Sequence, residues 1–282
     1  MAAESRTDSG PAREHRDRFI RDGCTVVDSG LPAEFHRAVY AKLDELFESE
    51  GNPGNNILPR VPELAEVFSA PAVREALTGL LGPDYILNPH RHCHLNPPGR
   101  PGQSWHKDCY VYDHNLRHPR FRWVLAFYYP QETTPDMGPT GVLRGTQWYR
   151  TISDPDPDKT TESELPLVGA AGSVAIVHFD AWHRAIANVS DRKRYMLKFQ
   201  FARTREPLPA GGNGAASSTG AAAAASGTVA SGAVTDDVAR WLDGQSGLSA
   251  FDAGDRIGPL VDRLSSTDPT ERAEAAGRLA LS

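Results

Sequence analysis

The pattern of hydrophobic residues changes at residue 85, and this change limits the folds open to the chain. Before it, apolar residues recur at helical spacing, as in residues 32–47 and 64–80. After it, short runs of aromatic and β-branched residues alternate with proline and glycine, at residues 85–95, 109–112, 122–129, 141–143, 173–178 and 195–202. Such runs after amino-terminal helices predict a mainly β fold with flanking helices, a jelly-roll (double-stranded β-helix) core with the helices packed on one side.

Composition divides the chain into four segments. Residues 1–12 are small and polar and are predicted to be disordered, and residues 13–205 contain the predicted jelly roll. Residues 206–234 are rich in alanine, glycine, serine and threonine. Because such a segment cannot bury enough apolar area to offset its ordering, it is predicted to be a flexible linker. Residues 235–282 are predicted to form a small helical tail.

The end of this tail has a pattern of its own. Residues 260–281 resemble a single HEAT-type helical repeat. One such repeat cannot bury its apolar face alone. We therefore expect the tail to pack on the jelly roll, on a second copy of the chain or on another partner.

Charge and cysteine content narrow the class of protein. The net charge is -6 and no block of basic residues stands out, which argues against a nucleic-acid or membrane-surface partner. No stretch approaches the length of a membrane span, and the amino terminus lacks the apolar segment of a secretion signal. The three cysteines are scattered, as suits a reducing compartment. We expect a cytoplasmic protein.

Three His-x-Asp triplets occur among the ten histidines, so the triplet by itself is a weak signal. Residues 15–17 lie in a charged stretch of helical pattern, where positions i and i+2 point to different faces. Residues 178–180 are followed by a single further histidine, His183, which leaves them without a separate distal partner. Residues 106–108 open the β-rich region, which gives this third triplet a different context.

His106 and Asp108 are expected to project to the same face, because side chains two apart on a strand do so. His183 follows the apolar run at residues 173–177 and supplies a distal imidazole. Two histidines and one carboxylate on one face of an octahedral ion form the facial triad of non-heme Fe(II) oxygenases. A 2-oxo acid can then chelate two open positions and leave the third for dioxygen. The sequence therefore predicts an iron site at these three residues.

Arg194 lies eleven residues after His183 and is a candidate for binding the far carboxylate of such a co-substrate. A planar guanidinium makes two parallel, charge-assisted hydrogen bonds to a carboxylate. Strand alternation places Arg194, Met196 and Lys198 on one face, so a cation can point inwards. The alternative is a surface residue within the basic run at residues 192–194.

At these residues the chain resembles the phytanoyl-CoA dioxygenase family of Fe(II)- and 2-oxoglutarate-dependent oxygenases. Three segments of the sequence carry the resemblance, namely PPGRPGQSWHKD, RWVLAFYYPQETTPDMGPTGVLRGTQ and HFDAWHRAIANVSDRKR, and it extends over residues 13–203. The resemblance implies Fe(II), 2-oxoglutarate and O2 as cofactor and co-substrates. It implies His106, Asp108 and His183 as catalytic metal ligands. It also implies that Arg194 anchors 2-oxoglutarate and that Trp123, unless it is a core residue, borders it.

The chain departs from the family pattern at three positions. Arg144 stands where a proline is usual, Gln147 where a histidine is usual, and Ala185 where a hydroxyl often contacts 2-oxoglutarate. These departures affect the expected substrate and the surroundings of the metal rather than the metal itself. Halogenating members of the wider superfamily carry a small residue at the position of Asp108, so the carboxylate here predicts oxygen insertion.

Alternate residues of the first predicted strand carry polar side chains, which are His90, His92, His94 and Asn96. We expect them to form a polar wall of the pocket, with His94 and Asn96 as candidate substrate-binding residues. The alternatives are a second metal site at the three histidines and an ordinary exposed surface.

Together these features favour a dioxygenase that hydroxylates a C–H bond of a small molecule and releases succinate and CO2. One alternative is a non-catalytic jelly-roll scaffold whose helical tail recruits a partner. A second is a zinc hydrolase, for which Asp180 is the obvious candidate general base. The substrate and the oligomeric state are not specified by the sequence.

Overall fold

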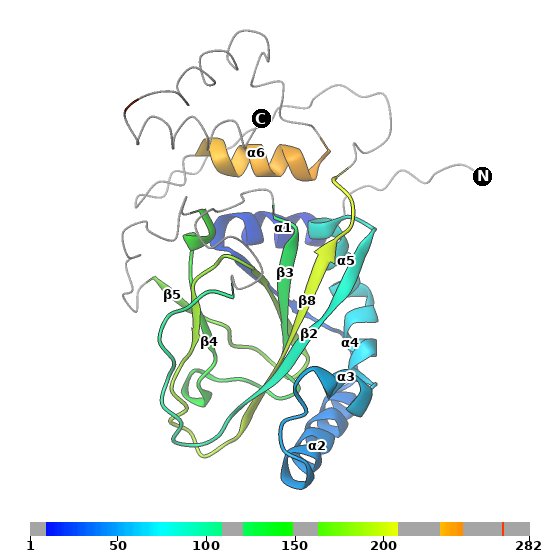
Figure 1. The fold of residues 1–282 in the computed structure, drawn as a ribbon, viewed down its shortest axis with the longest axis vertical. Coiled ribbons are helices and arrows are strands. Elements are labelled where there is room, and N and C mark those ends of the chain that lie inside the picture. Colours follow the sequence, from blue (N-terminus) through cyan, green and yellow to red (C-terminus); the bar gives the residue numbers. More distant parts are fainter. Residues whose placement is uncertain (1–9, 109–120, 149–162, 208–231, 245–266, 268–282) are drawn as a thin grey trace, which may run out of the picture.

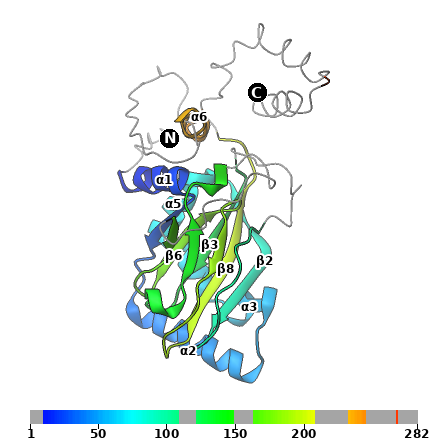
Figure 2. The same cartoon turned by 90° about the vertical axis from the view of Figure 1, so that its left-hand side faces the viewer.

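Two antiparallel β-sheets lie face to face, and helices cover the outer face of the larger one (Figures 1 and 2). The computed structural model describes residues 10–108, 121–148, 163–207, 232–244 and 267 of the chain. The larger sheet has the order β1-β6-β3-β8-β2, and the smaller has the order β5-β4-β7. The predicted fold class, a mainly β jelly roll with flanking helices, is confirmed.

Every neighbouring pair of strands in both sheets is antiparallel. The strands of the larger sheet are β1 (Cys24–Asp28), β6 (Ser173–His178), β3 (Trp123–Tyr128), β8 (Arg194–Arg203) and β2 (Tyr85–Asn96). Those of the smaller sheet are β5 (Glu164–Pro166), β4 (Thr140–Leu143) and β7 (His183–Ala185).

Strand β8 lies between β3 and β2 and is buried along its whole length. Its apolar residues Tyr195, Leu197 and Phe199 point to the core beneath the helices. Met196 points to the second core, between the two sheets. Because side chains alternate along a strand, Arg194 and Lys198 share the face of Met196 and also enter the space between the sheets.

Helices cover the outer face of the larger sheet (Figure 1). They are α1 (Gly10–Asp22), α2 (Ala33–Ser49), α3 (Ile57–Arg60), α4 (Leu64–Ser69) and α5 (Pro71–Leu81). Three 3-10 turns accompany them, η1 (Gly54–Asn56), η2 (Pro135–Met137) and η3 (Thr146–Trp148). Leu43 of α2 and Leu77 of α5 are fully buried in the core that these helices form with the sheet.

The elements differ from the predicted ones in a few places. The helix predicted over residues 64–80 is two helices, because Ala70 is extended, with ψ of 136°, and Pro71 begins α5. A proline clashes with a helical residue before it, which explains the break. Helix α1 begins at Gly10, within the segment predicted to be disordered. Strands β5 and β7 were not predicted, and the strand predicted at residues 109–112 lies outside the described residues.

Helix α6 (Gly232–Leu242) packs against α1 and the end of β8 (Figure 1). The Trp241 indole stacks on the Arg203 guanidinium at 4.2 Å and donates a hydrogen bond to Glu206 at 3.0 Å. Val238 of the same helix is fully buried. The first part of the predicted tail therefore docks on the jelly roll, and its helix begins within the predicted linker. The rest of the tail and most of the linker lie outside the described residues.

Among the helices that the structure describes, none has the length and apolar character needed to cross a membrane.

Candidate metal centre

His106 and His183 are brought together by backbone pairing. The His106 amide donates to the His183 carbonyl at 3.0 Å, and the His183 amide donates to the His106 carbonyl at 2.9 Å. Reciprocal bonds of this kind make the two residues direct cross-strand neighbours whose side chains lie on the same face. Their ring centroids are 4.5 Å apart. Strand β7 therefore holds one imidazole and positions the other through this bridge.

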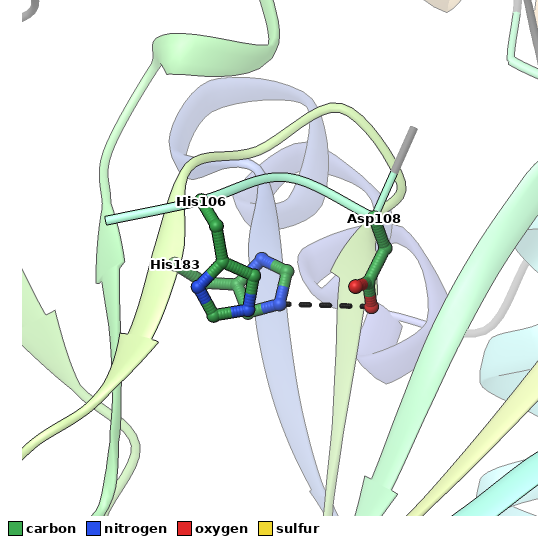
Figure 3. Close-up of side chains that lie close together, drawn as sticks. All are labelled: His106, Asp108 and His183. Atoms are coloured by element: carbon green, nitrogen blue, oxygen red, sulfur yellow. Dashed lines mark ion pairs between the residues drawn. The ribbon is translucent and has the colours of Figure 1, made fainter. Parts of the chain in front are cut away.

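Asp108 completes the cluster two residues after His106 (Figure 3). One potential ligand atom from each of the three side chains lies within 4.8 Å of the other two. The His183 Nε2 atom is 3.7 Å from the Asp108 Oδ2 atom. Among the described residues this is the one group of three or more histidine, cysteine or acidic side chains close enough to hold an ion. The second metal site considered at His90, His92 and His94 is therefore not supported.

Each imidazole is oriented by its Nδ1 atom. The Nδ1 of His106 is 3.0 Å from the Ser104 carbonyl, and the Nδ1 of His183 is 3.1 Å from the Ala181 carbonyl. Because a carbonyl can only accept, each Nδ1 carries the proton and donates it. The two Nε2 atoms are then left with lone pairs, as metal ligands require. The backbone thus fixes both the tautomer and the direction of the rings.

Burial and neighbouring charges keep His183 and Asp108 in their metal-binding forms. Burial lowers the pKa of His183 to about 4, so its imidazole is neutral at neutral pH. Burial by itself would raise the pKa of Asp108, but the neighbouring His183 and the Lys198 ammonium outweigh it and lower that pKa. A neutral imidazole and an ionised carboxylate are the forms that bind a divalent ion.

Arg194 lies on the inward face of β8 and is 1% exposed. Its Nε and Nη2 atoms donate to the Gly138 carbonyl at 3.1 and 2.7 Å. Its Nη1 atom is buried and has no hydrogen-bond partner among the described residues. A buried donor without a partner costs free energy, so the residue is suited to an anion that is supplied from outside the chain. A carboxylate of 2-oxoglutarate fits that requirement.

A frame of backbone and amide groups holds Arg194 in place. Gly138 has φ of +66°, and a Cβ there would lie 2.5 Å from the Ile186 carbonyl oxygen and 2.8 Å from the Asn188 amide nitrogen. The side-chain Nδ2 atom of Asn96 donates to the Gly138 and Ile186 carbonyls at 3.0 and 3.2 Å. The Asn188 side chain donates to the Asn96 carbonyl at 2.8 Å. Asn96, predicted to bind substrate, therefore uses its amide hydrogens to support the arginine site, and a substrate contact stays a prediction.

His94 lies on β2 between the residues that pair with Lys198 and with Arg194. It is opposite Met196 in the sheet, and its ring centroid is 4.6 Å from that of His92. Burial, followed by the neighbouring His92 and Lys198, lowers the pKa of His94 to about 3. It is therefore a neutral, partly buried imidazole on the inward side, and its predicted substrate contact stays a prediction.

Trp123 lies at the other end of the sheet. It pairs with Ala202, eight residues along β8 from Arg194, and its ring packs 6.4 Å from that of Phe179. At about 3.3 Å per residue the register separates the backbones of Trp123 and Arg194 by more than 20 Å. Any contact of Trp123 with 2-oxoglutarate would therefore be at the metal end of that molecule, and this contact also stays a prediction.

Comparison with known proteins identifies the family. The model of the phytanoyl-CoA dioxygenase (PhyH) family matches residues 19–196, which is more than half of the chain. The chain belongs to the phytanoyl-CoA dioxygenase family. Its chemistry is accordingly that of an iron- and 2-oxoglutarate-dependent oxygenase. No curated protein matches the sequence closely enough to be counted a relative.

Solved structures share the fold at low sequence identity. EctD from S. alaskensis is 19% identical with a TM-score of 0.57, and the match covers 70% of this chain and 79% of that one. The 2-oxoglutarate-dependent epimerase SnoN from nogalamycin biosynthesis is 16% identical with a TM-score of 0.55, covering 68% and 80%. The non-heme monooxygenase ThoJ, in a nickel complex, is 18% identical with a TM-score of 0.53, covering 69% and 81%.

The structure describes all three positions at which the chain departs from the family pattern. Gln147, in place of the usual histidine, is buried and donates to the Ile20 carbonyl at 3.0 Å. It also packs against Gly23, so it fixes the end of α1. Arg144 is exposed. Ala185 pairs with Thr140 on β4, which places a buried hydroxyl beside the position where the family often has one.

The ion pair of Lys198 with Asp108 was not predicted from the sequence. Its Nζ atom donates to the Asp108 Oδ2 atom at 2.8 Å, and the lysine is 8% exposed. Alternation along β8 already placed Lys198 on the face of Arg194. The contact with Asp108 had no sequence signal, because it joins residues 90 positions apart and depends on where the tertiary structure places Asp108 relative to β8.

Proposed function

We propose that this member of the phytanoyl-CoA dioxygenase family is an Fe(II)- and 2-oxoglutarate-dependent dioxygenase that hydroxylates a C–H bond of a small molecule. The observation that carries the proposal is the cluster of half-buried His106 with buried Asp108 and His183, in which backbone carbonyls hold both Nδ1 atoms. Two imidazoles and one carboxylate are the donor set that binds Fe(II) and leaves three positions open.

The remaining residues have distinct tasks in this proposal. When bound, the iron and 2-oxoglutarate together activate dioxygen, and the co-substrate leaves as succinate and CO2. Arg194 would bind the far carboxylate through Nη1 and so fix the direction in which 2-oxoglutarate lies. Phe127 lies 5.9 Å from the His183 ring and, with Leu125, keeps bulk water from that side of the site. His94 and Trp123 are the candidates for contacts with the substrate.

The nature of the oxidation is the finer part of the proposal, because the same fold serves different reactions. SnoN is named as an epimerase and SnoK as a carbocyclase of nogalamycin biosynthesis, and both depend on α-ketoglutarate. Hydroxylation adds one oxygen atom to the substrate, ring closure removes two hydrogen atoms, and epimerisation leaves the mass unchanged. Mass spectrometry of the product therefore separates the three reactions.

The test begins with purified protein, Fe(II) and 2-oxoglutarate under air. Succinate is measured with a panel of small molecules, and products are analysed after turnover in ¹⁸O₂. We expect substrate-dependent succinate and a product that has gained one labelled oxygen atom. A product without added oxygen would replace hydroxylation with one of the other two reactions. Metal binding without succinate on any substrate would favour the non-catalytic scaffold instead.

A further inference from the structure

The carboxylate of the metal cluster is already paired with a cation of the protein. Lys198 Nζ lies 2.8 Å from Asp108 Oδ2, and both side chains are buried, at 8% and 6% exposure. The lysine extends from the inward face of β8, where its backbone neighbours are Phe127 on β3 and His92 on β2. The lysine therefore stands on a strand that is paired on both sides, whereas Asp108 lies on the segment that follows the bridge at His106.

The same oxygen atom serves both partners. Asp108 Oδ2 is the atom 3.7 Å from His183 Nε2, so it is the oxygen that pairs with that imidazole (Figure 3). It is also the atom that Lys198 contacts. A divalent ion bound by the three side chains would therefore enter beside the ammonium group. The lysine and the metal must therefore contact the same carboxylate oxygen, or each must contact one of the two oxygens.

We propose that Lys198 is a placeholder cation for the metal, a positioning residue that neutralises and holds Asp108 while the site has no ion. The proposal rests on the proposed function only where it takes the ion to be iron. A buried carboxylate without a partner is strongly unfavourable, so the ammonium keeps the cluster assembled before metal enters. Metal binding then weakens or displaces this contact.

The proposal fixes the sign of an effect on metal affinity. The attraction between Lys198 and Asp108 stabilises the metal-free state, which binding must disturb. The repulsion between an ammonium and a divalent ion destabilises the loaded state. Both contributions weaken metal binding, so removing the ammonium should tighten it. A lysine that served only the folding of the site would have the opposite effect, because its loss would disorder Asp108.

The experiment measures Mn(II) binding to the metal-free full chain by the EPR signal of the free ion. We expect Lys198→Met to bind Mn(II) about tenfold more tightly than the wild type, and Lys198→Arg, which keeps the charge, to remain within about twofold. The matched control is Lys42→Met, which removes the same group on α2 from its ion pair with Glu63, the residue before α4. It should leave the affinity unchanged.

Weaker or unchanged binding in a folded Lys198→Met protein would overturn the proposal. If that variant does not fold, Lys198→Gln keeps a hydrogen-bond donor without the charge and is expected to show the same tightening to a smaller degree, and its failure to tighten would be decisive. Asp108→Ala separates this outcome from failure of the proposed function. Wild-type affinity in Asp108→Ala would refute the metal site itself, whereas lost binding there with no gain in Lys198→Met would refute only the placeholder.

Discussion

Arg194 and Lys198 are two buried cations on the same face of one strand, four residues apart, yet their surroundings differ. Arg194 donates two of its nitrogen atoms to a neutral carbonyl and keeps a third, Nη1, without a partner among the described residues. Lys198 donates to a carboxylate of the protein. The arginine therefore leaves a positive charge open to an anion from outside, and the lysine charge is already matched within the chain.

The comparison shows that charge and strand alternation do not assign a role. Both side chains satisfy the pattern of an inward cation on β8, but the partners come from other elements. Gly138 reaches Arg194 from the turn before β4, and Asp108 reaches Lys198 from the segment after the bridge at His106. The proposed roles, an anion anchor for Arg194 and a placeholder cation for Lys198, rest on those partners.

The largest expected effect, on metal binding and on activity, comes from removing Asp108, the partner of Lys198. Asp108→Ala should weaken metal binding and lower succinate formation by more than about a hundredfold, since even residues that only support a ligand account for 10–100-fold. Titration with Mn(II) and a succinate assay measure the two effects. Asp17→Ala is the matched control, because Asp17 ends another His-x-Asp triplet but is exposed on α1. Retained activity in Asp108→Ala would exclude the carboxylate as a ligand.

Removing the open cation should affect the co-substrate rather than the metal. Arg194→Met is expected to raise the KM for 2-oxoglutarate by about thirtyfold, since a lost charge-assisted hydrogen bond costs ~2 kcal/mol. The affinity for Mn(II) should stay near that of the wild type, in contrast to Lys198→Met. Arg192→Met removes an exposed arginine two residues away and serves as the control. If Arg194→Met changed metal affinity and left the KM unaltered, the two roles would have to be exchanged.

Gly138, whose carbonyl accepts from Arg194, can be changed without removing the charge of the arginine. Gly138→Ala places a Cβ against the Ile186 and Asn188 backbone at a φ of +66°, and is expected to destabilise the protein by about 2 kcal/mol and to raise the KM for 2-oxoglutarate. Gly30→Ala is matched in φ, at +70°, but its added Cβ meets open space. It should cost less and leave the KM alone. Denaturant unfolding and succinate kinetics distinguish the two variants.

The smallest expected effect concerns His94, which lies between the two cations. Its pKa is lowered to about 3 by burial, so below the ordinary histidine pKa of about 6.5 the unfolded chain takes up a proton that the folded protein excludes. Stability is therefore lost as the pH falls from 6.5 toward 3. At pH 6 the wild type loses about 1 kcal/mol of its free energy of unfolding in this way, and His94→Gln does not. Unfolding curves at pH 8 and pH 6 measure it, and an unchanged pH dependence would contradict the assigned pKa.

Much of the fold was predictable because long, regular elements carry a periodic signal. Residues 173–178 and 122–129 were expected as strands and are β6 and β3, within one residue at each end. The three-residue strands β5 and β7 are too short to show a period and exist through their pairing with β4. The division of one predicted helix into α4 and α5 depends on Pro71, whose effect on Ala70 outweighed an unbroken apolar pattern.

The candidate site was predictable to a similar extent. The residue types and their spacing singled out His106, Asp108, His183 and Arg194, and the structure gathers the first three into one cluster. The inward direction of Arg194 followed from alternation, but its open Nη1 atom could not be foreseen. The side-chain nitrogen of Asn96 is bonded to the carbonyls of Gly138 and Ile186, which no pattern foretold, and its contact with substrate stays a prediction.

The sequence by itself determined the chemistry that the chain carries and the class of fold. Metal-binding residue types, an arginine at a set offset and strand periodicity are local properties, and local patterns can be read along a chain. Only the tertiary structure decided which charges meet. The contacts of Lys198 with Asp108 and of Arg194 with Gly138 join residues 90 and 56 positions apart. Such pairs depend on the packing of the two sheets, and no spacing in the sequence encodes it.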